Sequence, residues 1–108
     1  MQKTLDDIDF TKHDGLIPVV VQDASTKQIL TLAYANKESL ALTQKTSKSW
    51  FWSRSRKQLW MKGEESGNTQ KVLEILVDCD SDSVIYLVEP SGPACHTGKE
   101  HCFHNNLV

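Results

Sequence analysis

The chain has 108 residues and a formal net charge of −2 at pH 7. This length allows one domain with a single hydrophobic core. The weak negative charge argues against a dedicated nucleic-acid-binding protein, and no apolar run is long enough to cross a membrane. The N-terminus has no apolar signal region, and the 3 cysteines fit poorly with a closed disulfide framework. We therefore predict a cytoplasmic protein with reduced thiols.

The first third of the chain is predicted to form an arm followed by a hairpin. Residues 1–14 are polar and acidic and are expected to form an arm or a short helix. Residues 16–22 are rich in β-branched residues and predict a strand, in which Pro18 indicates an edge strand or a strand start. Residues 23–27 are typical of a turn, and residues 28–34 predict a second strand that pairs with the first.

The middle of the chain is predicted to contain one helix and two short strands. Asn36 is a good N-cap, and the residues after it favour a helix that runs to about Lys45. Residues 50–52 and 59–62 predict strands. Two glycines, Gly63 and Gly67, indicate a loop over residues 63–68, between these strands and the last third of the chain.

Two further strands are predicted in the last third. Residues 72–77 are nearly all apolar and predict a central strand, and residues 84–88 predict another strand that Pro90 ends. The residues beyond Pro90 are rich in loop formers. Five or six short strands and one clear helix indicate a compact, β-rich α+β domain, whose strand order the sequence does not predict.

Three aspartates alternate along the chain directly after residue 77, as Asp78, Asp80 and Asp82. Alternate side chains of an extended strand share one face, but a straight strand would spread these three over roughly 13 Å. That span is too wide for one metal ion, so we predict a bend near Ser81. Carboxylates are hard ligands, which suit magnesium or calcium.

The same segment matches much of an EF-hand calcium loop when Asp78 is counted as position one, because Glu89 then falls at position twelve. Position six, however, is Ser83, where the sharp turn of that loop requires glycine. The flanking segments are predicted strands and loops rather than helices. The sequence therefore argues against an EF-hand.

All three cysteines, Cys79, Cys95 and Cys102, lie in the last third of the chain, each beside an ionisable residue. Three thiolates suit zinc and leave a fourth coordination position for water. A single cysteine is commonly a small buried hydrophobe, but polar or glycine residues surround Cys95 and Cys102. A thiolate site and a carboxylate site in one small region favour metal-assisted hydrolysis over a structural zinc finger, which usually has a Cys-x-x-Cys pair.

Histidines lie close to the thiols in sequence, as His96, His101 and His104. A lone histidine is more often a surface or hydrogen-bonded residue. Beside the thiols, one of these three can complete a zinc shell or transfer protons. We choose His96 for the proton-transfer role and leave His13 unassigned.

A segment rich in aromatic and basic residues contains the only two arginines of the chain. Guanidinium groups bind phosphate oxygens through paired hydrogen bonds, and serine hydroxyls add donors. The alternative is a strand with an aromatic core face and a solvated basic face. Single-strand nucleic-acid binders share this composition, but a short patch in an acidic protein favours a phosphorylated small molecule. The candidate substrate-binding residues are Trp52, Ser53, Arg54, Ser55 and Arg56.

Together these residues resemble one family, phosphoribosyl-AMP cyclohydrolase of histidine biosynthesis. The resemblance runs from about Leu16 to the end of the chain, and the motifs appear in the order and at the spacing of that family. The segments that carry it are Trp52-Ser53-Arg54-Ser55-Arg56-Lys57-Gln58-Leu59-Trp60, Lys62-Gly63-Glu64, Ser66-Gly67, Asp78-Cys79-Asp80-Ser81-Asp82, Gly92-Pro93-Ala94-Cys95-His96-Thr97-Gly98 and Cys102-Phe103.

The resemblance implies two metal sites and a dimer. The zinc ligands would be Cys79, Cys95 and Cys102, and the magnesium ligands would be Asp78, Asp80 and Asp82. The family forms an intertwined homodimer in which each zinc site is shared between the chains. Many relatives carry a second, pyrophosphohydrolase domain, which we do not expect here, since residues 1–108 are expected to form one cyclohydrolase domain.

The implied reaction is the hydrolytic opening of the adenine ring of phosphoribosyl-AMP. The ribosyl group on N1 leaves C6 electron-poor, and zinc makes hydroxide available near neutral pH. Attack on C6 opens the ring at the C6–N1 bond, whereas zinc deaminases expel the exocyclic amine. Magnesium and the pair Arg54 and Arg56 would hold the two phosphates, while His96 moves protons. The alternative function is a structural-zinc module that binds phosphorylated or nucleic-acid ligands.

Overall fold

The computed structural model describes residues 2–95 and 97–107. These residues form six β-strands, one α-helix and one short 3-10 turn, which confirms the predicted β-rich α+β class. Each predicted strand and the helix occur within two residues of the expected bounds. The elements are η1 (Leu5–Asp7), β1 (Ile17–Asp23), β2 (Ile29–Ala35), α1 (Lys37–Thr46), β3 (Trp50–Ser53), β4 (Gln58–Met61), β5 (Gln70–Val77) and β6 (Val84–Pro90).

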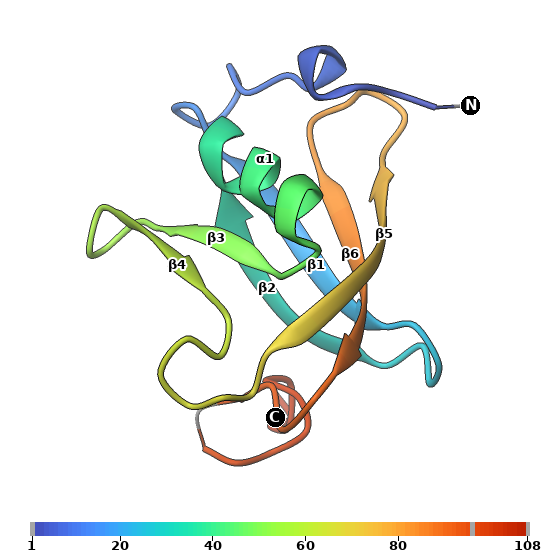
Figure 1. Cartoon of the computed structure of the whole chain (residues 1–108), viewed down its shortest axis with the longest axis vertical. Coiled ribbons are helices and arrows are strands. Elements are labelled where there is room, and N and C mark those ends of the chain that lie inside the picture. Colours follow the sequence, from blue (N-terminus) through green and yellow to red (C-terminus); the bar gives the residue numbers. More distant parts are fainter. Residues whose placement is uncertain (1, 96, 108) are drawn as a thin grey trace.

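Four of the strands form one sheet, and the other two form a separate hairpin. The order in the larger sheet is β2-β1-β6-β5, and β3 pairs with β4. β1 and β6 are parallel, whereas the β1–β2, β3–β4 and β5–β6 pairs are antiparallel. Figure 1 shows α1 and β3 lying over the same face of the four-stranded sheet.

One prediction about strand position is wrong. The predicted central strand at residues 72–77 is β5, which is an edge strand. Two residues of its apolar run, Leu73 and Leu76, are half exposed, at 49% and 44%. β1 is a central strand with Pro18 as its second residue, so of the two positions that Pro18 indicated, an edge strand or a strand start, the start is confirmed. Pro18 precedes Val19, the first residue of β1 that pairs with β6, so its missing N–H costs that ladder nothing.

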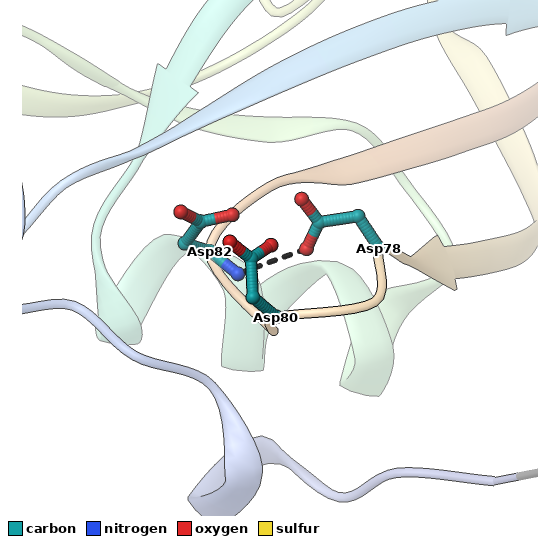
Figure 2. Close-up of side chains that lie close together, drawn as sticks. All are labelled: Asp78, Asp80 and Asp82. Carbon is teal, nitrogen blue, oxygen red and sulfur yellow. Dashed lines mark hydrogen bonds between the residues drawn. The ribbon is translucent and has the colours of Figure 1, made fainter.

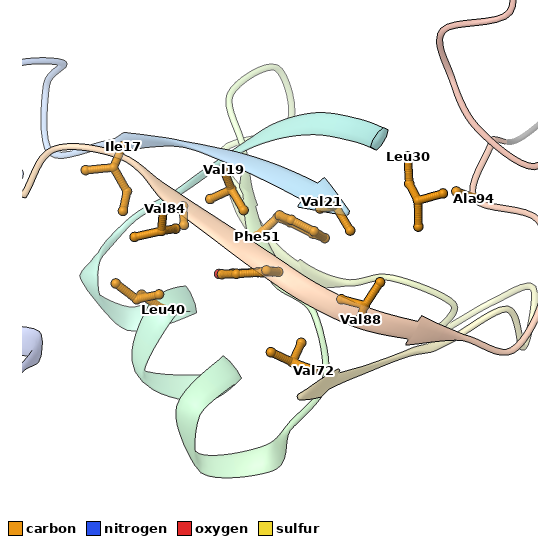
Figure 3. Packing of buried hydrophobic residues seen from close by; sticks show 12 residues of the cluster. Ile17, Val19, Val21, Leu30, Leu40, Phe51, Val72, Val84, Val88 and Ala94 are labelled. Atoms are coloured by element: carbon orange, nitrogen blue, oxygen red, sulfur yellow. The ribbon is translucent and has the colours of Figure 1, made fainter. Parts of the chain in front are cut away.

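The core fills the space between the four-stranded sheet and α1. Alternate residues of the two central strands are buried there, as expected for strands with one face toward the core. They are Ile17, Val19 and Val21 of β1 and Val84, Tyr86 and Val88 of β6. Figure 3 shows Leu40 of α1 and Phe51 of β3 packed among them.

A buried cluster around Tyr86 joins the helix and the two sheets. Its ring centroid lies 5.6 Å from that of Phe51, which lies 4.8 Å from that of Trp60. The Tyr86 hydroxyl donates to the Trp50 carbonyl at 3.1 Å, and the Thr43 hydroxyl accepts from the Trp50 amide at 3.0 Å. Burial raises the pKa of Tyr86, so the hydroxyl stays neutral. These contacts fix the β3–β4 hairpin, which carries the candidate substrate residues.

The helix begins where the sequence predicts. The Asn36 side chain accepts from the Ser39 amide at 2.8 Å, and the Ser39 hydroxyl accepts from the Asn36 amide at 2.9 Å. This reciprocal pair satisfies two donors at the helix start. Ser47, with a φ of 58°, ends the helix.

The opposite face of the sheet carries an apolar row. Leu32, Val20, Ile85 and Leu76 are directly paired across all four strands, so their side chains share this face. The two outer members, Leu32 and Leu76, are 51% and 44% exposed. We call these four residues the outer row. A hollow of about 400 Å³ joins the row to the turn after β5, because Val20, Leu76, Ile85 and Asp78 all line it.

Candidate active site and its metal ligands

The three aspartates lie in a tight turn between β5 and β6, which we call the acidic turn (residues 78–82). Ser81 has a φ of 61°, in the left-handed region, and the chain folds back there, which confirms the predicted bend. One carboxylate oxygen from each of Asp78, Asp80 and Asp82 lies within 4.8 Å of the other two. Figure 2 shows the three carboxylates gathered on the turn. Such a donor set fits a hard divalent cation.

Asp78 holds the acidic turn in shape. Its carboxylate accepts hydrogen bonds from the Ser83 hydroxyl at 2.6 Å, the Asp82 amide at 2.9 Å and the Ser83 amide at 3.2 Å. These donors, with the Ser83 hydroxyl first, hold the pKa of Asp78 well below its ordinary value. The carboxylate is therefore ionised at neutral pH and fixed before any cation binds.

Lys12 contacts the other two carboxylates from the N-terminal arm. Its Nζ lies 2.9 Å from Oδ2 of Asp82 and 3.5 Å from Oδ2 of Asp80. The Lys12 hydrogen bond lowers the pKa of Asp82, but the hydrogen bonds that Asp82 shares with Asp78 and Asp80 outweigh it and raise the pKa overall. The carboxylates therefore repel one another even beside a lysine, and additional positive charge would stabilise the turn.

Two of the three cysteines lie together in the C-terminal loop. Cys95 is buried, and its Sγ accepts a hydrogen bond from the Thr97 hydroxyl at 3.1 Å and lies 3.8 Å from His104 Nε2. These contacts, with the Thr97 hydroxyl first and the Cys102 thiol contributing last, lower the pKa of Cys95 to about 6. The thiolate, which is the form that binds zinc, therefore predominates at neutral pH. The Cys102 amide anchors the loop to β2 by donating to the Leu30 carbonyl at 2.8 Å.

The turn that contains Cys79 and the C-terminal loop that contains the other two cysteines lie at opposite ends of the β5–β6 hairpin, as those two segments do in Figure 1. Cys79 follows Val77, which pairs with Val84, whereas Cys95 follows Pro90 at the far end of β6. The 7 residues of β6 span about 20 Å, while sulfurs that share one zinc lie within about 4 Å of one another. One chain therefore does not bring its three free thiols together, and the expectation of both metal sites in one small region is wrong for a single chain.

The candidate phosphate-binding residues lie at the tip of the β3–β4 hairpin, where Arg54, Ser55 and Arg56 are exposed. The Arg54 guanidinium lies 3.9 Å above the centre of the Tyr34 ring of β2, a cation–π contact. The Ser53 hydroxyl accepts from the Arg56 amide at 3.2 Å and so shapes the turn. Figure 1 shows this tip projecting away from both the acidic turn and the C-terminal loop.

The three tryptophans have different surroundings. The Trp50 indole donates to the Thr46 hydroxyl of α1 at 3.2 Å, and Trp60 packs on Phe51 at the edge of the core. Both therefore support the fold. Trp52, half-buried on β3, is left as the candidate for stacking on a substrate base.

Two of the three histidines near the thiols lie within the described residues. His96, our choice for proton transfer, lies outside the described residues. The ring Nδ1 of His101 accepts from the Phe103 amide at 3.1 Å, which is a local structural bond. His104 is the histidine that the described residues place beside the Cys95 thiol.

Sequence reasoning missed three residues at these sites: Lys12, Tyr34 and Thr97. A hydroxyl two residues after Cys95 is a signal for a thiol hydrogen bond, so Thr97 was open to prediction. Lys12 reaches an aspartate 70 positions away, and Tyr34 meets Arg54 only through the packing of β3 beside β2. Neither contact leaves a signal in the local sequence.

Comparison with known proteins identifies the family. The family model of phosphoribosyl-AMP cyclohydrolase matches residues 31–104. A protein of that name from Nitrosopumilus maritimus is 74% identical over 107 residues, which cover 99% of both chains. The chain belongs to the phosphoribosyl-AMP cyclohydrolase family. This finding confirms the resemblance drawn from the motifs.

Other relatives are also similar to this chain over most of its length. The phosphoribosyl-AMP cyclohydrolase of Cenarchaeum symbiosum is 67% identical over 108 residues and covers 100% of both chains. A bifunctional histidine biosynthesis protein of Thermus thermophilus is 62% identical over 94 residues, which are 87% of this chain and 44% of that protein. Among the described residues, no helix has the length and apolarity that a membrane crossing requires.

The contact between Thr97 and Cys95 predicts a testable reactivity. In metal-free protein, the pH midpoint for alkylation of Cys95 by iodoacetamide is expected near the pKa of about 6. Thr97→Val removes the strongest donor to the thiolate and should move this midpoint up, toward the ordinary thiol value of roughly 8.5. Peptide mass spectrometry across a pH series measures it. Thr97→Ser keeps the hydroxyl and should keep the low midpoint; equal midpoints in all three proteins would contradict the assignment.

Proposed function

We propose that the chain is a zinc-dependent hydrolase of histidine biosynthesis, which opens the adenine ring of phosphoribosyl-AMP at the C6–N1 bond. Family membership carries this proposal, because the family model spans most of the chain and two relatives that bear the enzyme's name match its full length. The zinc and magnesium ligands, the homodimer and the residue roles that follow are parts of the same proposal.

The zinc site is proposed to form between two copies of the chain. Cys79 of one copy would meet Cys95 and Cys102 of the partner subunit. The separation of these residues along the β5–β6 hairpin supports this arrangement, since one chain holds them at opposite ends. The thiolate character of Cys95 and the nearness of Cys102 to it support a preformed half-site in the C-terminal loop.

The outer row is proposed as the surface that brings the copies together. An open, apolar sheet face is suited to burial against a second copy, and a twofold axis would place the same face on both sides of the contact. The row is continuous with the acidic turn through the hollow lined by Leu76 and Asp78. A partner packed there is therefore close to Cys79, where its own C-terminal loop is needed. This supports the intertwined homodimer that the resemblance implies.

The acidic turn is proposed to bind magnesium, for which its three carboxylates are a suitable donor set. The phosphate groups of the substrate would be held by this cation and by Arg54 and Arg56. The exposed guanidinium groups at the hairpin tip and the nearby hydroxyls of Ser53 and Ser55 support the second assignment. Half-buried Trp52 would stack on the purine.

The chemistry of the proposed site divides between the metal and the chain. Zinc, when bound by the three thiolates, supplies a water molecule of lowered pKa that is reactive at neutral pH. The Thr97 hydroxyl keeps Cys95 ionised, so the ligand is ready at that pH. His96 is our proposed proton-transfer group, and His104 is a second imidazole within 3.8 Å of the Cys95 sulfur.

Turnover tests the proposed function directly. Zinc-loaded protein should change the ultraviolet absorbance of phosphoribosyl-AMP as the purine ring opens, and removal of zinc by a chelator should abolish the change until zinc is restored. Mass spectrometry of the product should show the addition of one water. If the zinc-loaded protein binds phosphoribosyl-AMP but returns it unchanged, the function is that of a zinc-stabilised binding module instead.

Metal analysis of variants tests the two donor sets separately. Cys79→Ser, Cys95→Ser and Cys102→Ser should each lose tightly bound zinc and turnover, because two thiolates remain of three. Asp80→Asn should keep zinc but lose the dependence of turnover on magnesium. Full zinc content in any cysteine variant would remove that cysteine from the site, and loss of zinc in Asp80→Asn would contradict two separate sites.

Mixed dimers test whether the zinc site is shared between chains. Cys79→Ala and Cys102→Ala homodimers should both be inactive. In a dimer of one chain of each, one site collects both lesions and the other site is intact. With random assembly about half of the dimers are mixed, so roughly a quarter of wild-type activity should return.

The mixed-dimer experiment needs co-expression with two different affinity tags, because an intertwined dimer does not readily exchange chains. Purification over both tags isolates the mixed dimers, in which one site of two is intact, so about half of wild-type activity is expected in the purified fraction. A mixed dimer of one Cys95→Ala chain and one Cys102→Ala chain provides the matched control. Each chain then carries a lesion in its own C-terminal loop, so neither zinc site of the dimer can be intact. Absence of activity in verified Cys79/Cys102 mixed dimers would exclude the shared site.

A further inference from the structure

The N-terminal arm (residues 3–12) lies against the acidic turn and is anchored to its backbone. Lys3 Nζ donates to the Ser81 hydroxyl at 2.6 Å and to the carbonyls of Asp78 and Cys79 at 3.2 and 3.3 Å. The Asp9 amide donates to the Ser81 carbonyl at 2.7 Å. These contacts use main-chain atoms and a serine hydroxyl of the turn, so they leave its carboxylates free.

Lys12, at the end of this arm, contacts the carboxylates themselves. Asp78 is already engaged by the amide and hydroxyl donors of the turn, whereas Asp80 and Asp82 present their Oδ2 atoms to Lys12 Nζ at 3.5 and 2.9 Å. Both carboxylates belong to the set of three whose donor oxygens lie within 4.8 Å of one another. The ammonium group therefore pairs with two of the carboxylates that a bound divalent cation would use as ligands.

We propose that Lys12 competes with the divalent cation for the acidic turn. It neutralises Asp80 and Asp82 when no divalent cation is bound, and its ammonium group leaves when the cation arrives. This inference rests on the proposed magnesium site. Two positive groups on the same pair of carboxylates would repel each other at such short distances. Displacement is sterically simple, because the Lys12 side chain is already 43% exposed and the Lys3 and Asp9 contacts keep the arm in place.

The competing role differs from a positioning role in the sign of its effect. If Lys12 oriented Asp82 for metal binding, its removal would weaken the affinity for magnesium. If Lys12 competes, its removal must strengthen that affinity. The residue then sets the magnesium concentration at which the site fills, and it protects the turn from carboxylate repulsion when the cation is absent. Lys12 lies outside residues 31–104, which the family model matches.

The test is calorimetric titration of magnesium chloride into zinc-loaded Lys12→Met, Lys12→Arg and wild-type proteins. Lys12→Met keeps the length of the side chain without its charge and should lower the dissociation constant about two- to fivefold, a range set by the strength of exposed ion pairs. Lys12→Arg keeps the charge and a forked donor for two carboxylates, so it should bind magnesium no more tightly than wild type.

Lys37→Met is the matched control for the loss of one positive charge. Lys37 pairs with Asp6 at 3.7 Å and, among the described residues, forms no ion pair with the acidic turn. Its substitution should leave the magnesium affinity unchanged, because exposed charges beyond the immediate site are screened by salt. Thermal unfolding gives a second readout. Metal-free Lys12→Met should melt below wild type, and the rise in melting temperature on addition of magnesium should be larger in this variant than in wild type.

The outcomes distinguish the competing role of Lys12 from the existence of the magnesium site. Competition is supported if Lys12→Met binds magnesium more tightly than wild type while Lys12→Arg and Lys37→Met do not. It is also supported if Lys12→Met is the one protein of the four that binds magnesium measurably. Equal or weaker binding in Lys12→Met, with binding still abolished by Asp80→Asn, overturns the role of Lys12 and leaves the magnesium site standing. Absence of magnesium binding in both wild type and Lys12→Met overturns the competing role and the magnesium site together, while turnover and zinc content remain independent measures of the cyclohydrolase function.

Discussion

The β5–β6 hairpin is the constraint on which the rest of the structure depends. Its ladder fixes the acidic turn at one end and the C-terminal loop at the other, about 20 Å away along the strand direction. Buried Val84, Tyr86 and Val88 hold β6 in the core, so neither end can move toward the other without unfolding the sheet. The acidic turn and the C-terminal loop of one chain are therefore held apart by this hairpin.

Each part is built to hold charge before any ligand arrives. In the acidic turn, backbone amides and the Ser83 hydroxyl fix the Asp78 carboxylate. In the C-terminal loop, the Thr97 hydroxyl fixes the Cys95 thiolate. Preorganised donors of this kind lower the cost of assembling a metal site, because the ligands are already ionised and oriented. In the dimer that we propose, a second copy of the chain would bring these two prepared surfaces together.

Local signals were sufficient to predict most of the fold. The Asn36 cap, the β-branched strand at residues 16–22 and the bend near Ser81 follow from short-range chemistry, and all are present. The edge position of β5 was not predictable from its apolar run, because Leu73 and Leu76 are half exposed although leucine is a common core residue. Apolar side chains on an open face and in a core leave the same pattern in sequence.

The candidate site was predictable by residue type but not by arrangement. Motifs pointed to three cysteines and three aspartates, yet only the strand register shows that Cys79 and Cys95 lie at opposite ends of a hairpin. The contacts of Lys12 with Asp82 and of Arg54 with Tyr34 likewise depend on long-range packing. Sequence spacing records which ligands are available, whereas the topology decides how many chains are needed to use them.

The central claim is that two chains build one zinc site, and anomalous diffraction at the zinc absorption edge tests it most directly. Crystals of the zinc-loaded protein should show each zinc about 2.3 Å from the sulfurs of Cys79 of one chain and of Cys95 and Cys102 of the other. A zinc ion held by Cys95, Cys102 and His104 of one chain, with Cys79 remote from it, would contradict the account.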